Sequence, residues 1–151
     1  MRWSELGEEA CSVARTVSVI GDRWTLLVLR DCFLRIRRFE DFQARLGITR
    51  PVLADRLRKL VAAGVLEKVA YQQRPIRHEY RLTEKGLELW PALVALMHWG
   101  DRHLSGDEGP PAALVHRGCG GAMTGRRTCA ACDTELGPRD VEVLGAGASV
   151  V

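Results

Sequence analysis

A histidine and three cysteines near the end of the chain form two closely spaced pairs. Two residues separate His116 from Cys119, two separate Cys129 from Cys132, and nine lie between the pairs. Ligands at this spacing can bind one ion from a tight turn, and three thiolates with one imidazole satisfy tetrahedral zinc. Structural zinc also supplies folding free energy, about 10–16 kcal/mol in small peptides, to segments with few large apolar side chains. We therefore expect zinc as a structural cofactor.

The cysteines leave two other interpretations open, a redox pair of Cys129 and Cys132 or free thiols in a loosely ordered segment. A thioredoxin-like enzyme is not favoured, because that pair follows no buried strand. The total of five cysteines is odd, which argues against a disulfide framework. Cys32 is expected in the core. Cys11 stands just before a predicted helix, where exposure favours a reactive thiol, so it is a redox candidate.

Positive charge is concentrated in the middle of the chain. Residues 35–81 carry twelve Lys/Arg against five Asp/Glu, whereas the other residues carry ten against fourteen. Such a segment suits a polyanion-binding surface, although a solvated helix face is an alternative. The 151 residues allow one main domain with a small appendage. No apolar run approaches the roughly 20 residues of a membrane span, and the first ten residues are too polar for a secretory leader, so we expect a cytoplasmic protein without a membrane partner.

A helix that begins at Thr49 positions many of these cations. Thr49 is a suitable N-cap, Pro51 is tolerated in a first turn, and Gly64 can end the helix. Its apolar residues share one face: Leu53, Leu57, Leu60 and Val61. The flanks and the opposite face carry Arg50, Val52, Asp55, Arg56, Arg58 and Lys59. The cations therefore point away from the core.

The neighbouring segments complete a recognisable plan. Residues 39–46 form a short amphipathic helix that Gly47 can end in a left-handed conformation. After the basic helix, residues 65–71 and 76–82 alternate like strands and predict a hairpin with a basic tip. Two helices joined by a tight turn and followed by a hairpin form a helix-turn-helix with a wing. Such a second helix fits the major groove of DNA.

Further helices flank this unit. Helices are expected over residues 12–20 and 23–33, the second capped by Asp22 and mostly buried. Thr83 should cap a long final helix. Pro91 should either bend this helix or mark its true start.

The final helix has more apolar surface between residues 87 and 99 than one small core covers. With Trp3 and the first helix nearby, this face predicts a twofold homodimer. The alternative is that Trp90 and Trp99 cover the core of the monomer. The predicted fold class is α+β, a mainly helical winged helix-turn-helix with a hairpin wing and a zinc-ribbon-like C-terminal segment. The expected boundaries are 1–104 for the DNA-binding and dimerisation domain, 105–113 for a linker, 114–144 for the Cys/His segment and 145–151 for a tail.

The chain also resembles a known family in four successive blocks: CSVARTVSVIGDRWTLLVLRDCF, RRFEDFQARLGI, LADRLRKLVAAGVLEKVAY and HEYRLTEKG. These are similar to the HxlR-type transcriptional regulators, winged-helix proteins related to MarR regulators, over about residues 11–104. The resemblance implies a dimeric repressor or activator, with terminal helices at the dimer contact and the helix from Thr49 in the groove. It also places Cys11 where some members carry a redox-sensing cysteine. Pro51 and Val52 depart from the polar residues frequent at the start of this helix.

Within this interpretation the cations divide by role. We expect Arg50 and Arg56 to contact bases, because a bidentate arginine discriminates for guanine. Asp55 is expected to orient an arginine. We expect Lys59, Arg38 and Arg45 to contact backbone phosphate. Arg74 and Arg77 on the wing should reach either the backbone or an adjacent minor groove. For any single arginine, a surface ion pair or plain solvation is the alternative.

The predicted function is a DNA-binding transcriptional regulator, a repressor rather than an activator. As a homodimer it would bind an inverted repeat of double-stranded DNA with half-sites about 34 Å apart. A small-molecule effector, a thiol or a metal would control its release. The alternative is a winged-helix docking module that contacts a partner protein through the Cys/His segment. An enzyme is not expected, because the sequence has no Gly-rich phosphate loop and no paired carboxylates near a histidine.

Overall fold

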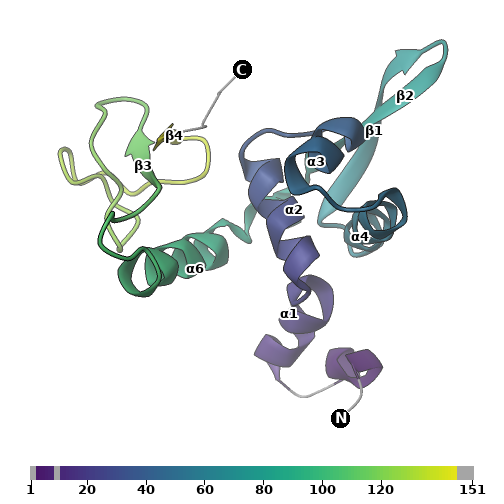
Figure 1. Ribbon diagram of the computed structural model, residues 1–151, viewed down its shortest axis with the longest axis horizontal. Helices are drawn as coiled ribbons and strands as arrows, with labels where there is room; N and C mark the ends of the chain where they lie inside the picture. Colours follow the sequence, from purple (N-terminus) through teal and green to yellow (C-terminus); the bar gives the residue numbers. More distant parts are fainter. Residues whose placement is uncertain (1–2, 9–10, 146–151) are drawn as a thin grey trace. The chain divides into compact units, whose positions relative to one another are not determined.

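The computed structural model describes residues 3–8 and 11–145 (Figure 1). It divides into two compact units, residues 1–87 and 88–151, and each is described by itself. The expected tail falls almost entirely on residues 146–151, outside the described residues. Among the described residues, no helix is long and apolar enough to cross a membrane.

The N-terminal unit is a group of helices followed by a β-hairpin. Its elements are the 3₁₀ helix η1 (Trp3–Glu8), α1 (Ser12–Ile20), α2 (Arg23–Phe33), α3 (Phe39–Leu46), α4 (Arg50–Ala62), β1 (Leu66–Gln73), β2 (Ile76–Leu82) and α5 (Glu84–Leu87). The helix α2 contacts α3, α4 and β2. Fully buried side chains form its core: Val28, Leu29, Phe42, Leu53, Leu57 and Leu60. The winged helix-turn-helix prediction is confirmed.

Local signals set the helix boundaries as predicted. Asp22 caps α2, its Oδ1 accepting hydrogen bonds from the backbone N–H groups of Trp24 (3.0 Å) and Thr25 (3.2 Å). Gly47 ends α3 in the left-handed region at φ 63°. The helix α4 begins directly after Thr49, but the Thr49 side chain makes no capping hydrogen bond.

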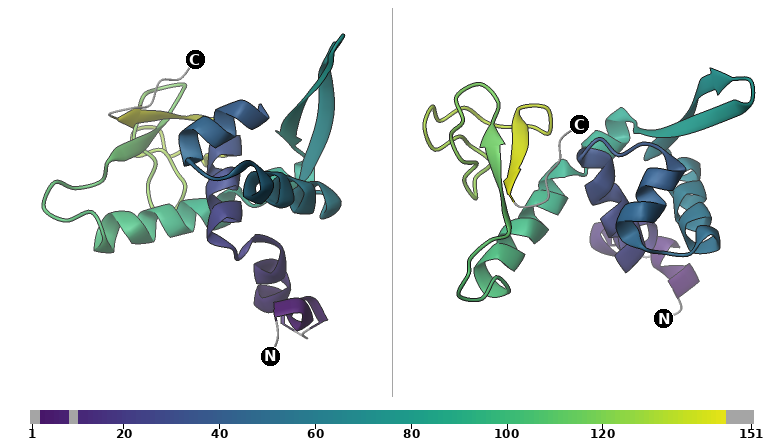
Figure 2. Two further views of the ribbon diagram at one scale, coloured as in Figure 1. Left: turned by 45° about the vertical axis from the view of Figure 1, so that its right-hand side comes forward. Right: turned by 45° about the horizontal axis from the view of Figure 1, so that its top comes forward.

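The hairpin of β1 and β2 is antiparallel and runs from the pair Leu66 and Leu82 to the pair Gln73 and Ile76. The pairing shifts between Ala70 and Gln72, which places a bulge in β1. At its base, β1 contacts α4. Figure 2 shows the hairpin extending beyond the helices of its own unit. This element has the geometry of a wing beside the second helix of the motif.

After the hairpin, the chain forms two helices where the sequence predicts one long helix. Thr83 caps only the short α5, accepting the N–H of Gly86 at 3.1 Å. A Cβ on Gly86 would lie 2.2 Å from the carbonyl oxygen of Val65, so this position requires glycine. The next helix, α6 (Trp90–His103), has Pro91 in its first turn. Pro91 thus marks a true helix start, one of the two expected outcomes.

The C-terminal unit combines α6 with an irregular, hairpin-like segment. Strands β3 (Ala112–His116) and β4 (Val141–Gly145) pair antiparallel. The chain between them contributes isolated bridges, including Met123 with Cys129. Among the residues of this unit whose burial the structure describes, few are buried: Trp90, Val94, Val115, Cys129, Leu136 and Val141. The expected domain boundary after residue 104 stays a prediction, and the compact unit itself begins before α6.

Candidate nucleic-acid interface and metal site

Arg50 is exposed at the first residue of α4, and two contacts hold its side chain. Its Nη1 donates to Oε1 of Gln43 at 3.2 Å, and its guanidinium lies 4.7 Å from the ring centroid of Phe39. Both partners belong to α3, the preceding helix. The guanidinium is therefore oriented by the helix-turn-helix itself while remaining accessible.

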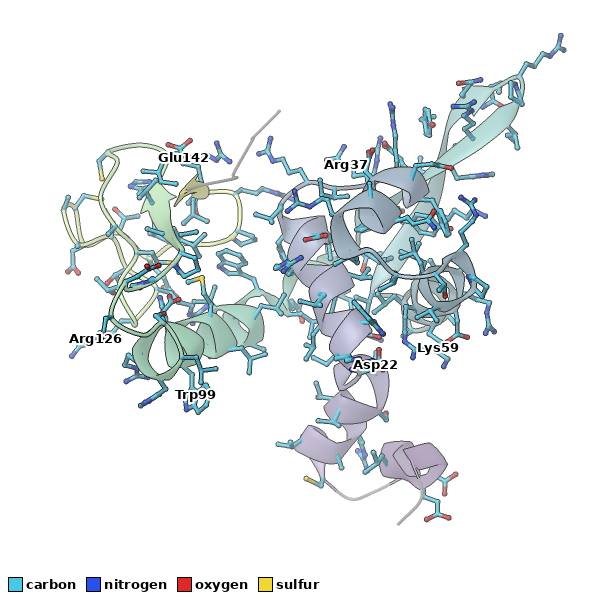
Figure 3. All side chains as sticks on the ribbon, viewed as in Figure 1. Asp22, Arg37, Lys59, Trp99, Arg126 and Glu142 are labelled. Carbon is cyan, nitrogen blue, oxygen red and sulfur yellow. The ribbon has the colours of Figure 1, made fainter. Side chains whose placement is uncertain are left out.

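Asp55 gathers the other cations of α4. Its carboxylate accepts hydrogen bonds from Arg56 and Arg58 and pairs with Lys59 at 2.9 Å. The hydrogen bond from Lys59, with that from Arg58, holds the pKa of Asp55 below its ordinary value despite slight desolvation. Arg58 and Lys59 remain 74% and 60% exposed, so they stay available to an outside anion. Figure 3 shows Lys59 on α4.

Arg56 differs from its neighbours because it is tied to another helix. Its Nε and Nη2 donate to the two carboxylate oxygens of Asp22 at 2.7 and 3.2 Å. Burial raises the pKa of Asp22, but the hydrogen bond from Arg56 and those from the Thr25 and Trp24 N–H groups outweigh it and lower that pKa. Only 22% of the Arg56 side chain is exposed. This geometry joins α4 to the start of α2 and does not favour the base contact expected of Arg56.

The cations on α3 and in the loop before it are partly engaged. The guanidinium of Arg38 lies 4.5 Å from the ring centroid of Tyr71 on β1. Arg45 Nε lies 3.4 Å from Asp31 Oδ2, and its side chain is 39% exposed. Asp31 itself is fully buried on α2 and also pairs with Arg30 at 2.8 Å. Sequence reasoning missed Asp31, because one acidic residue in an apolar helix gives no local sign of burial.

The wing presents cations at its tip. Arg74 in the turn and Arg77 on β2 are both exposed, and Ile76 between them is 61% exposed. The N–H of Tyr80 on β2 donates to the carbonyl of Arg37 at 2.8 Å, which fixes the loop before α3 to the wing. Arg37 is labelled in Figure 3 and is itself exposed. Wing, loop and α4 thus supply separate groups of accessible cations.

The structure brings the four predicted metal ligands together. Their ligand atoms lie within 4.8 Å of one another and could hold a metal ion. His116 Nδ1 lies 3.3 Å from Cys119 Sγ and 3.5 Å from Cys132 Sγ. Cys119 Sγ lies 3.2 Å from Cys129 Sγ and 3.6 Å from Cys132 Sγ. Zinc bond lengths imply tetrahedral edges of about 3.8 Å between sulfurs and about 3.6 Å between sulfur and nitrogen, so the cluster has a suitable size.

The remaining cysteines have contrasting environments. Cys32 is buried on α2, and burial together with the adjacent Asp31 raises the pKa of its thiol to about 12, as suits a core residue. Cys11 is exposed and is the N-cap residue of α1. Of these two thiols, only Cys11 is open to an oxidant.

Comparison with known proteins matches this chain to a described protein family. The family profile described as HxlR-like helix-turn-helix matches residues 19–108, which is more than half of the chain. The chain belongs to this family. Regulation of transcription through a DNA-binding winged helix-turn-helix follows from that membership.

Relatives and solved structures resemble the chain over different lengths. The uncharacterized HTH-type transcriptional regulator Rv3095 of Mycobacterium tuberculosis is 47% identical over 133 residues, 88% of this chain and 84% of its own. The structure of PA1607, a candidate transcription factor, is 37% identical, has a TM-score of 0.75 and covers 93% of this chain and 98% of its own. The redox regulator HypR in its oxidized form is 33% identical, has a TM-score of 0.56 and covers 62% of this chain and 97% of its own.

The coverage distinguishes two parts of the chain. Any continuous match of 133 residues in a chain of 151 must include residues 19–133, so the similarity to Rv3095 reaches all four clustered ligands. The family match itself ends at residue 108, before the first of them. The Cys/His segment is therefore an addition to the shared helix-turn-helix.

Proposed function

We propose that this family member is a homodimeric repressor that binds an inverted-repeat operator. The observation that carries the proposal is the construction of α4. Three fully buried leucines anchor one side of this helix, while Arg50, Arg58 and Lys59 are exposed. An amphipathic helix with a free cationic side and a basic hairpin next to it matches the way winged helices dock on a duplex.

The roles within this interface follow from accessibility. Arg50 contacts a base in the major groove, because it is exposed at the first turn and oriented by α3. Thr49 and Val52 flank it at the same end of the helix. Arg56 positions α4 through Asp22 instead of touching DNA.

Phosphate contacts come from exposed cations on several elements. We assign them to Lys59, Arg38, Arg45, Arg74 and Arg77. Because they lie on α4, on α3, in the loop before it and on the wing, they can hold the duplex at separated points.

Exposed apolar side chains support a twofold homodimer. On α6 and just after it, Leu96, Trp99 and Leu104 are 55%, 54% and 73% exposed. On α1, Val13 is 71% exposed. Trp90 is buried, so only this tryptophan of α6 serves the core of the monomer. A second copy that covers these faces would remove apolar surface from water, and its twofold axis would set the operator symmetry.

The release signal is proposed to be oxidation of Cys11. This thiol is exposed at the start of α1, and one structural neighbour is named a redox regulator. A small-molecule effector is the alternative. Mass spectrometry after mild oxidant, paired with operator binding by a Cys11→Ser variant, separates them, because the variant should keep binding DNA under oxidant.

Selection of bound sequences from a random DNA pool, followed by footprinting, tests the proposed function. The selected site should be an inverted repeat. Arg50→Ala should lower discrimination at one position of each half-site by about 1–3 kcal/mol, whereas Lys59→Ala should weaken all sequences alike. Arg126→Ala, at an exposed arginine of the other unit, is the matched control and should change neither. If the protein prefers no duplex over random DNA at physiological salt, the docking-module alternative replaces this function.

A further inference from the structure

Two turns with the same hydrogen bonding hold the four clustered ligands. In the first turn, the carbonyl of His116 accepts the N–H of Gly120 at 2.7 Å, and the N–H of His116 donates to the carbonyl of Gly121 at 2.8 Å. In the second turn, the carbonyl of Cys129 accepts the N–H of Asp133 at 2.9 Å, and the N–H of Cys129 donates to the carbonyl of Thr134 at 2.9 Å. Each first ligand therefore bonds to the residues four and five positions later.

The second ligand of each turn is also placed in the same way. The residue that follows it has a left-handed backbone, with φ 70° at Gly120 after Cys119 and φ 56° at Asp133 after Cys132. The two turns therefore reverse the chain with the same backbone geometry.

The two turns pack directly against each other. A Cβ on Gly121 would lie only 2.5 Å from Cys129 Sγ and 2.8 Å from the Ala131 side chain. A glycine at this position lets the first turn approach the thiol of the second. All three cysteines of the cluster are free, and Cys119 Sγ lies 3.2 Å from Cys129 Sγ, against about 2.05 Å in a disulfide bond.

We propose that these paired turns form a closed structural zinc site of His116, Cys119, Cys129 and Cys132, and that zinc holds the C-terminal segment together. Four protein ligands leave no open position, which distinguishes a structural site from a catalytic one. The segment between β3 and β4 contributes only Cys129 and Leu136 to the buried apolar residues, so the ion would supply the crosslink that a larger core otherwise provides. The inference is independent of DNA binding.

Elemental analysis of the full chain tests the site. The protein is purified under reducing conditions and dialysed against zinc before its metal content is measured. We expect one zinc per chain. Cys132→Ser and His116→Ala should lose it, whereas His116→Cys, which restores a fourth ligand, should retain it. Cys11→Ser is the matched control, because it removes a cysteine outside the cluster. Substoichiometric zinc in a folded, reduced chain, or equal zinc in the control and Cys132→Ser, overturns the proposal.

Two further measurements keep the test independent of folding defects in a variant. Cobalt substituted into the unmodified chain should give the visible absorption of a tetrahedral thiolate site, with stronger sulfur-to-metal charge transfer in His116→Cys than in the unmodified chain. After zinc is removed with a chelator, the backbone amides of β3, β4 and the two turns should lose protection against hydrogen exchange. The amides of α2 to α4 should keep it. An octahedral cobalt spectrum, or protection unaffected by chelation, contradicts a structural zinc site.

Discussion

Replacing Arg56 by alanine removes the ion pair that joins α4 to Asp22 at the start of α2. Two of its hydrogen bonds reach Asp22, and the pair is 22% and 34% exposed. Hydrogen bonds to charged groups contribute about 1.5–3 kcal/mol when buried, and exposed ion pairs about 0.2–1 kcal/mol. The half-buried Arg56 pair lies between these ranges. We expect Arg56→Ala to lower the free energy of unfolding by about 1–2 kcal/mol and Tm by about 5–10 °C.

Urea unfolding at fixed protein concentration measures this loss, and a double-mutant cycle assigns it. Asp22→Asn keeps a good N-cap but removes the charged partner, so the double variant should lose less than the sum of the single losses. Arg58→Ala, at a 74% exposed arginine on the same helix, is the control and should change stability by less than about 0.5 kcal/mol.

The same variant separates positioning from base recognition. As a positioning residue, Arg56 should leave the selected operator sequence unchanged while affinity falls modestly for every sequence. If Arg56→Ala kept full stability but altered the preferred bases, the reasoning from the Asp22 contact would be refuted, and Arg56 would be a base reader that leaves Asp22 on binding.

Three further outcomes are expected. The pKa of Asp22 in the folded chain lies below its ordinary value of 3.8. The stability that its ionised carboxylate contributes is therefore fully present at neutral pH and is lost as the pH falls through the folded pKa. Unfolding measured over an acid pH series should accordingly show a weaker pH dependence in Arg56→Ala than in the unmodified chain. Gly86→Ala should cost about 1–3 kcal/mol in urea unfolding, because its Cβ would meet the Val65 carbonyl, and an unchanged midpoint would contradict that crowding. Arg74→Ala and Arg77→Ala should each reduce the slope of log K against log salt by about one, whereas an unchanged slope would place the wing away from phosphate.

Features coded by neighbouring residues could be predicted from the sequence. The Asp22 cap, the left-handed Gly47 and the start of α4 depend on residues within a few positions, so propensity and periodicity were sufficient. The two pairs of candidate metal ligands also follow from local spacing, because each pair lies within one turn.

Features that depend on tertiary contacts could not be predicted. Asp22 and Arg56 are 34 residues apart, and no local pattern marks them as partners. The same holds for buried Asp31 with Arg45, and for Gly86 against Val65. Thr49 shows the limit of a local rule, since the helix starts there without the expected side-chain hydrogen bond.

The three cations around Asp55 also affect how binding should depend on ionic strength. Because this carboxylate already neutralises part of their charge, DNA binding in the proposed mode should displace fewer condensed ions than the number of basic residues on α4 suggests. A negative group inside a positive surface also weakens attraction to any arbitrary stretch of DNA. In the proposed DNA complex, Asp55 would therefore limit occupancy of the many competing genomic sites, while Arg50 at the first turn of α4 would contact its base.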